Sequence, residues 1–167
     1  MKLKIERAKS SDAKELLDYT KKIGAESDNV TFGPEGLPFT VEQEADFIKS
    51  REAAKLSPFF VARYDGKIIG IANLDVVDRE RLRHRGEIGI SVLKEFWGNG
   101  IGSLLMQEII KFALFNNIEI LHLTVRSDNE RAIALYKKFG FEKTGMMVGE
   151  MKINGELIDC DIRCLKI

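Results

Sequence analysis

Cysteine and proline are scarce in this chain, and the shortage of cysteine excludes a disulfide-stapled domain. Only two of the 167 residues are cysteines and three are prolines. Cys160 and Cys164 are four residues apart, which in a strand separates their Cα atoms by about 13 Å. A disulfide needs a separation under about 7 Å, so we expect two reduced thiols. Reduced thiols are typical of a cytoplasmic protein.

An excess of one charge and a long apolar run are also missing. Lys and Arg together number 26, as do Asp and Glu, so the formal net charge is zero. Balanced charge gives no electrostatic reason to expect a nucleic-acid or anionic-membrane partner. Residues 1–7 alternate polar and apolar, unlike a signal peptide, and no segment approaches the roughly 18 apolar residues of a membrane span.

The composition that remains is that of a globular protein. Hydrophobic residues make up 44% of the chain and charged residues 31%. A chain of this length buries roughly 70% of the surface that its unfolded form exposes, so it needs no metal staple. No His/Cys/Asp cluster has metal-ligand spacing, and no linker or repeat interrupts the chain. We therefore expect one domain over residues 1–167, without a metal.

Periodicity and turn signals predict eleven elements. Leu3 and Ile5 mark a first strand, and a helix opens near Ser11. A capping box, Thr40-x-x-Gln43, opens a second helix that runs to about Lys55. The later elements are strands at 59–64, 67–77, 86–93 and 118–125, helices at 100–115 and 127–139, and a final hairpin around Asn154-Gly155.

The start of the last helix and the order of the elements complete the fold prediction. Ser127-x-x-Glu130 reads as a second capping box, and Gly140 stands at the C-terminal cap position. The resulting order is β-α-α-β-β-β-α-β-α-β-β. It predicts a mixed α/β sheet and not the βαβα alternation of a doubly wound nucleotide fold.

The segment with the clearest chemistry is a strand that runs through a glycine-rich turn into a helix. Gly98, Gly100 and Gly102 remove Cβ atoms, and the helix start offers unpaired N–H groups, a combination suited to a phosphate or pyrophosphate. The spacing alone also fits a turn without a ligand. The turn lacks the Gly-Lys-Ser/Thr of a P-loop and the third glycine of a dinucleotide fingerprint, which disfavours a nucleotide-binding regulator.

Two motifs in order resemble the GCN5-related N-acetyltransferase (GNAT) family. Gly98-Asn99-Gly100-Ile101-Gly102 is similar to that family's acetyl-CoA motif, Arg/Gln-x-x-Gly-x-Gly/Ala. Asn129-x-x-Ala132-Ile133-x-Leu135-Tyr136-x-Lys138-x-Gly140-Phe141 is similar to its second motif. The resemblance is sharp over residues 86–141 and implies the GNAT-type fold, acetyl-CoA as cosubstrate and acetyl transfer to a primary amine.

The resemblance also implies a site, residue by residue. Ile90 and Val92 would lie on a strand edge that pairs with the pantetheine arm, and a backbone N–H, that of Val92, would stabilise the oxyanion. Asn129 would hydrogen-bond the pantetheine, and Tyr136, with an ordinary pKa near 10, would protonate the leaving thiolate. The pyrophosphate would be cradled by Trp97, Gly98, Asn99, Gly100, Ile101, Gly102 and Ser103.

Other interpretations of these residues stay open at this point. Tyr136 also fits a core aromatic, and Asn129 also fits a helix N-cap. Glu87, at the start of the fourth strand, is a candidate base or water-holding carboxylate, or else a solvated side chain. His122 is a weaker candidate for the same role, and His84 reads as part of a solvated loop.

Two departures from the family pattern concern the turn. Trp97 occupies the position of the usual Arg or Gln, and Lys94 replaces a common proline. Because backbone groups hold the pyrophosphate, we expect the change at Trp97 to alter affinity and not to abolish binding.

The acceptor is the part that the sequence leaves open. The resemblance implies an amine of a small molecule or of a protein N-terminus, and it is compatible with a homodimer through the last strands. A catalytically silent acyl-CoA-binding module is the alternative. The acceptor would be shaped by the first two helices, their loop and the last hairpin, which contain Glu26, Asp28, Asn29, Phe32, Val148 and Ile158.

Overall fold

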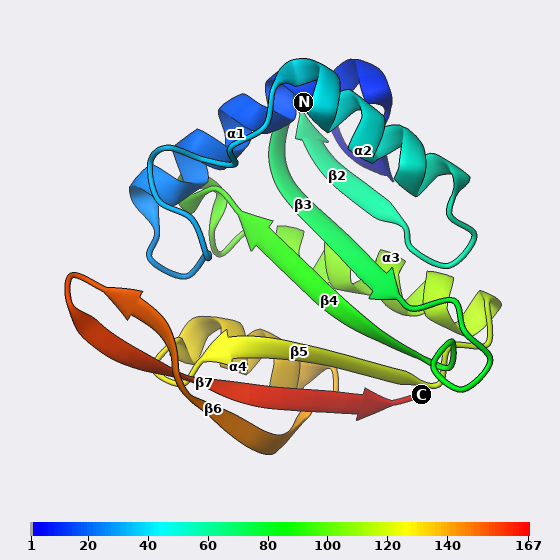
Figure 1. The fold of residues 1–167 in the computed structure, drawn as a ribbon, viewed down its shortest axis with the longest axis vertical. Coiled ribbons are helices and arrows are strands. Elements are labelled where there is room, and N and C mark those ends of the chain that lie inside the picture. The colour runs from blue at the N-terminus through cyan, green and yellow to red at the C-terminus, as the bar shows by residue number, and fades with distance from the viewer. Residues whose placement is uncertain (1) are drawn as a thin grey trace.

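A seven-stranded mixed sheet forms the centre of the computed structural model, which describes residues 2–167 (Figure 1). The strand order is β1-β2-β3-β4-β5-β7-β6, and only β4 and β5 run parallel. The strands are β1 (Leu3–Arg7), β2 (Phe59–Tyr64), β3 (Lys67–Val76), β4 (Arg85–Val92), β5 (Ile120–Arg126), β6 (Glu142–Ile153) and β7 (Glu156–Lys166).

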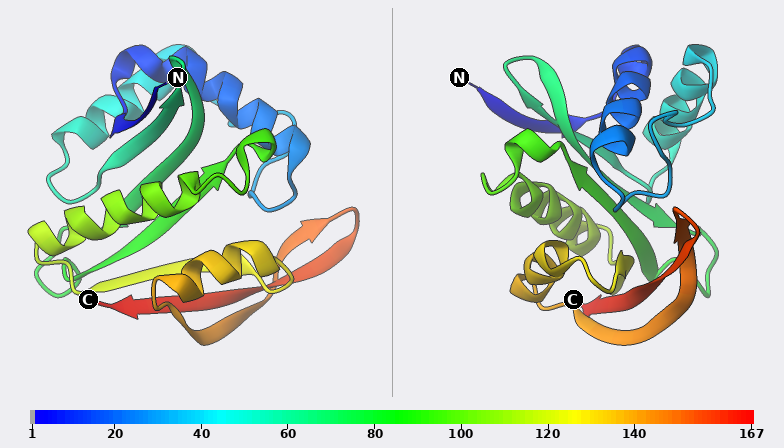
Figure 2. Two further views of the ribbon diagram at one scale, coloured as in Figure 1. Left: turned by 180° about the vertical axis from the view of Figure 1, so that it is seen from behind. Right: turned by 90° about the vertical axis from the view of Figure 1, so that its left-hand side faces the viewer.

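Helices cover both faces of this sheet, as Figure 2 shows. Helices α1 (Ala13–Glu26) and α2 (Val41–Ala53) lie on one face, and α3 (Ile101–Phe115) and α4 (Glu130–Lys138) lie on the other. Strand β2 is buried on both faces over residues 59–62, because helices sandwich it. The helix and strand order predicted from the sequence is therefore confirmed.

The local signals that were read from the sequence have clear structural counterparts. Thr40 caps α2, and its hydroxyl accepts from the N–H of Gln43 at 3.2 Å. Asn154 and Gly155 take φ values of 51° and 83°, as a type I′ hairpin turn requires. Gly140 follows α4 with φ 92°, the left-handed conformation expected of a C-terminal cap.

The predicted capping box at the start of α4 is wrong. Asn129 is the N-cap, and its side-chain oxygen accepts from the N–H of Ala132 at 3.2 Å. The hydroxyl of Ser127 instead donates to Asp161 on β7 at 2.7 Å. The Ser127 hydroxyl thus bonds a residue 34 positions away and not the start of α4, where the sequence pattern had placed it.

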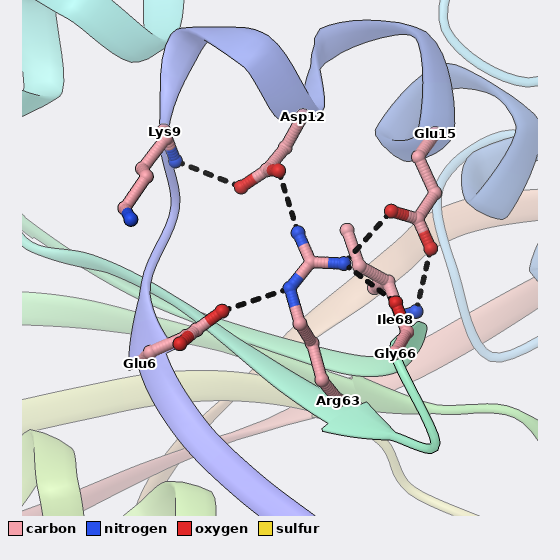
Figure 3. A network of polar contacts seen from close by, with 7 residues as sticks. All are labelled: Glu6, Lys9, Asp12, Glu15, Arg63, Gly66 and Ile68. Carbon is pink, nitrogen blue, oxygen red and sulfur yellow. Dashed lines mark hydrogen bonds and ion pairs between the residues drawn. The ribbon is translucent and has the colours of Figure 1, made fainter.

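One partly buried guanidinium joins the first elements of the chain (Figure 3). Arg63 on β2 contacts Glu6 at 2.9 Å, Asp12 at 2.5 Å and Glu15 at 2.8 Å. A second oxygen of Glu15 accepts from the N–H of Ile68 at 2.7 Å. These contacts tie β1 and the start of α1 to the β2–β3 hairpin.

The feature that positions the candidate site is the early separation of β4 from β5. Only three residue pairs join the two strands, the last being Glu87 with His122. Strand β4 continues for five more residues, and β5 turns away with β7 as its partner. The parallel pairing therefore opens into a wedge in the middle of the sheet.

Candidate active site

A cavity of about 950 Å³ occupies the wedge between β4 and β5. It is bounded by the end of α1 with the loop that follows, by residues 88–92 of β4, by the glycine turn (residues 97–103), by the end of β5, and by the start of α4. Segments far apart in the sequence thus meet at one opening in the sheet.

Strand β4 presents an unpaired backbone edge to this cavity. The N–H of Leu93 donates to the carbonyl of Ile69 on β3 at 2.9 Å. Because backbone groups alternate sides along a strand, the N–H and C=O groups of Ile90 and Val92 point the other way, into the wedge. This edge is suited to an extended ligand that carries amide groups.

The glycine turn leads the chain from β4 into α3 along the cavity wall. Gly98 and Gly100 have φ values of 78° and 77°, and a Cβ on either would meet no atom within 4 Å. A Cβ on Gly102 would lie 3.1 Å from Leu135, so this glycine lets α3 and α4 approach closely. The first N–H groups of α3 have no helical partner, as at any helix start, and such free N–H groups are suited to an anion.

Trp97 fixes one end of the glycine turn. Its indole N–H donates to the carbonyl of Val92 at 2.7 Å, which leaves the N–H of Val92 free for a ligand. The guanidinium carbon of Arg131 lies 4.1 Å from the centre of the Trp97 ring. The sequence offered no signal for this contact, because Arg131 belongs to a different element.

Tyr136 lies on the opposite wall of the cavity, on α4. It is buried, and its ring packs 5.9 Å from that of Phe141. Burial raises the pKa of Tyr136 well above its ordinary value near 10, so the hydroxyl keeps its proton at neutral pH. The core-aromatic and cavity-facing interpretations of this residue are therefore compatible.

Most of the predicted site residues line the cavity, and two do not. Asn99 turns its amide back to the carbonyls of Phe96 and Trp97, each at 3.2 Å, and supports the turn from outside the cavity wall. Glu87 lines a smaller cavity together with His122, 3.9 Å away. The predicted residues on the wall of the large cavity are Ile90, Val92, Trp97, Gly98, Gly100, Ile101, Gly102, Ser103, Asn129 and Tyr136.

The loop after α1 forms the other end of the cavity, which is rich in acids. Glu26 accepts from the N–H of Lys94 at 2.5 Å, so this carboxylate joins the end of α1 to the turn that follows β4. Arg126 forms a two-pronged ion pair with Asp128 and donates to the carbonyl of Asp28 at 3.2 Å. Glu26, Asp28 and Asp128 thus bring three carboxylates to the cavity lining, whereas Val148 and Ile158 are not among the lining residues.

Some kinds of site are absent from the described residues. Within residues 2–167, no group of three or more His, Cys, Asp or Glu side chains is arranged to hold a metal ion. No helix in the same range combines the length and the apolar character needed to cross a membrane. Cys160 and Cys164 are both free thiols.

Comparison with known proteins agrees with this geometry. The model of the acetyltransferase (GNAT) family matches residues 24–141. The chain belongs to the GNAT family. The structure of a GNAT acetyltransferase from Streptococcus pneumoniae superimposes with a TM-score of 0.95 at 33% identity, covering 99% of this chain and all of that one.

Named GNAT relatives match over shorter stretches. The L-amino acid N-acetyltransferase AaaT of Escherichia coli is 37% identical over 100 residues, which are 59% of this chain and 62% of AaaT. The N-alpha-acetyltransferase RimI of Mycobacterium tuberculosis is 31% identical over 107 residues, 64% of this chain and 66% of RimI. The match thus spans less than two thirds of each of these relatives.

Proposed function

We propose that this protein transfers the acetyl group of acetyl-CoA directly to a primary amine of a small molecule or a protein N-terminus. The observation that carries the proposal is the unpaired edge of β4 between the glycine turn and Tyr136. The edge suits the amides of a pantetheine arm, and the turn suits a diphosphate. Acetyl-CoA therefore fits the cavity as a substrate that supplies the activated acetyl group.

The residues of the chain support direct transfer. The free N–H of Val92 is available to donate to the oxygen of the acetyl group as negative charge develops there. Tyr136 is protonated at neutral pH and lines the same cavity, as a general acid for the departing sulfur requires. No cysteine lines the cavity, so the proposal involves no covalent thioester on the protein.

The acidic end of the cavity supports an amine acceptor. Asp28 and Glu26 lie where the acceptor would approach, and a cationic amine is attracted to them. The names of the relatives point to several amines, including amino acids, protein N-termini and, for a 29% identical Escherichia coli protein, spermidine. Glu87 stays a candidate base only through a water relay, because it lines the neighbouring cavity.

The test is acetyl-CoA-dependent release of free thiol across amino acids, polyamines and N-terminal peptides. We expect turnover on one acceptor class and a loss of at least about 100-fold in kcat for Tyr136→Phe, the range of general acid catalysis. Tyr64→Phe is the matched control, because Tyr64 does not itself line the cavity and only its ring packs on a lining residue, Phe96.

Each other result has a separate meaning. Full activity in Tyr136→Phe would show that Tyr136 is not the general acid, while the assignment as an acetyltransferase would stand. Acetyl-CoA binding without turnover on any amine would support a silent binding module instead. Absence of acetyl-CoA binding would refute both.

A further inference from the structure

Cationic side chains gather around the glycine turn. Around the glycine turn lie three cationic side chains: Arg131 and Lys94 over the Trp97 ring, at 4.1 Å and 6.0 Å, and Lys138, whose ammonium is 3.4 Å from the hydroxyl of Ser103. Among residues 2–167, none of the three forms an ion pair with a carboxylate. The lining of the cavity also carries the carboxylates of Glu26, Asp28, Asp128 and Glu130, of which Asp128 is paired with Arg126.

Arg131 is the cation that lies closer to the Trp97 ring, at 4.1 Å against 6.0 Å for Lys94. Its guanidinium packs on the Trp97 ring, and the ring is itself anchored by the hydrogen bond from the indole to Val92. Stacking on an aromatic face uses none of the five N–H donors of the guanidinium. The donors of Arg131 therefore stay available, and both Arg131 and Trp97 line the cavity.

The backbone N–H groups of the glycine turn and the guanidinium of Arg131 face the cavity from two different elements. The glycine turn contributes N–H groups from the start of α3, and Arg131 contributes a charge from the first turn of α4. Backbone N–H groups carry only partial charge, so a dianionic group between them gains from a full charge on the other side. Trp97 is itself uncharged and serves as the platform for that charge.

We propose that Arg131, seated on Trp97, is the side-chain cation that binds the diphosphate of acetyl-CoA against the glycine turn. The inference rests on the proposed function, because it names a residue for the cosubstrate of that reaction. It assigns Trp97 a positioning role through its ring and not a direct contact with phosphate.

Binding of CoA to the intact protein tests the proposal without any need for turnover. Trp97 is the only tryptophan, so its fluorescence reports on the site directly, and calorimetry covers variants that lack it. We expect Arg131→Met to weaken CoA and dephospho-CoA binding by roughly tenfold each, as loss of one charge-assisted contact does. Pantetheine, which has no phosphate, should bind both proteins equally.

Three further variants test the role of the Trp97 ring as the platform for Arg131. Trp97→Leu should weaken CoA binding, and the double variant Trp97→Leu/Arg131→Met should be no weaker than Arg131→Met alone, because the two residues act as one unit. Trp97→Arg in the Arg131→Met background should restore affinity by returning a cation to the turn. Thermal melts show whether each variant is folded.

The control is Lys137→Met, which removes the same charge from an exposed position on the same helix. If Arg131→Met binds CoA as Lys137→Met does, the proposal is wrong while the transferase assignment stands. An effect that vanishes with dephospho-CoA would also overturn it, by locating Arg131 at the 3′-phosphate. If the unmodified protein binds no CoA, the proposed function itself fails.

Discussion

At the scale of single residues, Asn129 combines two roles that the sequence presented as alternatives. Its side-chain oxygen caps α4 through Ala132, and the residue also lines the large cavity. The amide nitrogen is not used in the cap. A residue of this kind is able to start a helix and contact a ligand at once, because an Asn side chain has a separate acceptor and donor.

Substitution at Asn129 separates the two roles. Asn129→Ser keeps a capping oxygen but has no amide, so we expect unchanged stability and acetyl-CoA affinity lowered by about fivefold, the value of one neutral hydrogen bond. Asn129→Ala should show the same loss of affinity and also lose about 1 kcal/mol of stability. Calorimetry and thermal denaturation measure the two effects. Equal affinity in Asn129→Ser and the unmodified protein would assign Asn129 to the cap alone.

His122 gives a prediction about pH. Burial, reinforced by Arg85, lowers the pKa of His122 below its ordinary value of 6.5, and its Nδ1 atom is buried without a partner. The unfolded chain takes up a proton below pH 6.5 while the folded chain does not, so stability should fall as pH decreases from 6.5 toward the folded pKa.

The comparison is with His122→Gln, which cannot titrate. The free energy of unfolding, measured from pH 8 to pH 5, should decline less steeply in this variant, and the two curves should run parallel above pH 7. If the free energy of unfolding fell equally steeply below pH 6.5 in both proteins, His122 would have the same pKa in the folded and unfolded chain.

At the scale of elements, Arg63 sets the attachment of the first strand and helix. Its side chain is only 16% exposed, and one partner, Asp12, is 13% exposed, so removal of the guanidinium leaves a shielded carboxylate without a cation. We expect Arg63→Met to lose stability between the ~1 kcal/mol of an exposed pair and the roughly 3 kcal/mol of a buried one.

The exposed pair of Lys14 with Asp18 provides the control for this measurement. Its side chains are 79% and 62% exposed, and Lys14→Met should change the free energy of unfolding by less than about 0.5 kcal/mol. Chemical denaturation of both variants gives the comparison. Equal stability in Arg63→Met and Lys14→Met would mean that the ion pairs of Arg63 make no net contribution to the free energy of unfolding.

The elements themselves were predictable because their signals are local. Turn residues such as Asn154-Gly155 and the Thr40 capping box act within a few residues, and both appear in the structure as expected. Ser127 shows the limit of such signals. Its hydroxyl could bond either within the start of α4 or with a residue far along the chain, and in the structure it bonds the distant Asp161.

At the scale of the whole molecule, the parts that escaped prediction depend on pairs far apart in the chain. Arg131 meets Trp97 across 34 residues, and Arg126 meets Asp28 across 98. Motifs placed the turn, Asn129 and Tyr136 on one cavity, but they carry no information on which side chains face them. Glu87 illustrates the same point, because its strand position was predictable and its exclusion from the cavity lining was not.

The wedge in the sheet has a consequence for self-association. Unpaired strand edges are the feature through which β proteins recruit strands of other molecules and aggregate. Here the open edge of β4 lies at the middle of the sheet, with β5, α4 and the glycine turn around it. A strand from a neighbouring molecule would have to enter the cavity to reach that edge. The fold thus leaves the free backbone groups of β4 accessible to a narrow, extended ligand. The same groups on an outer strand of the sheet would be open to pairing with strands of other molecules.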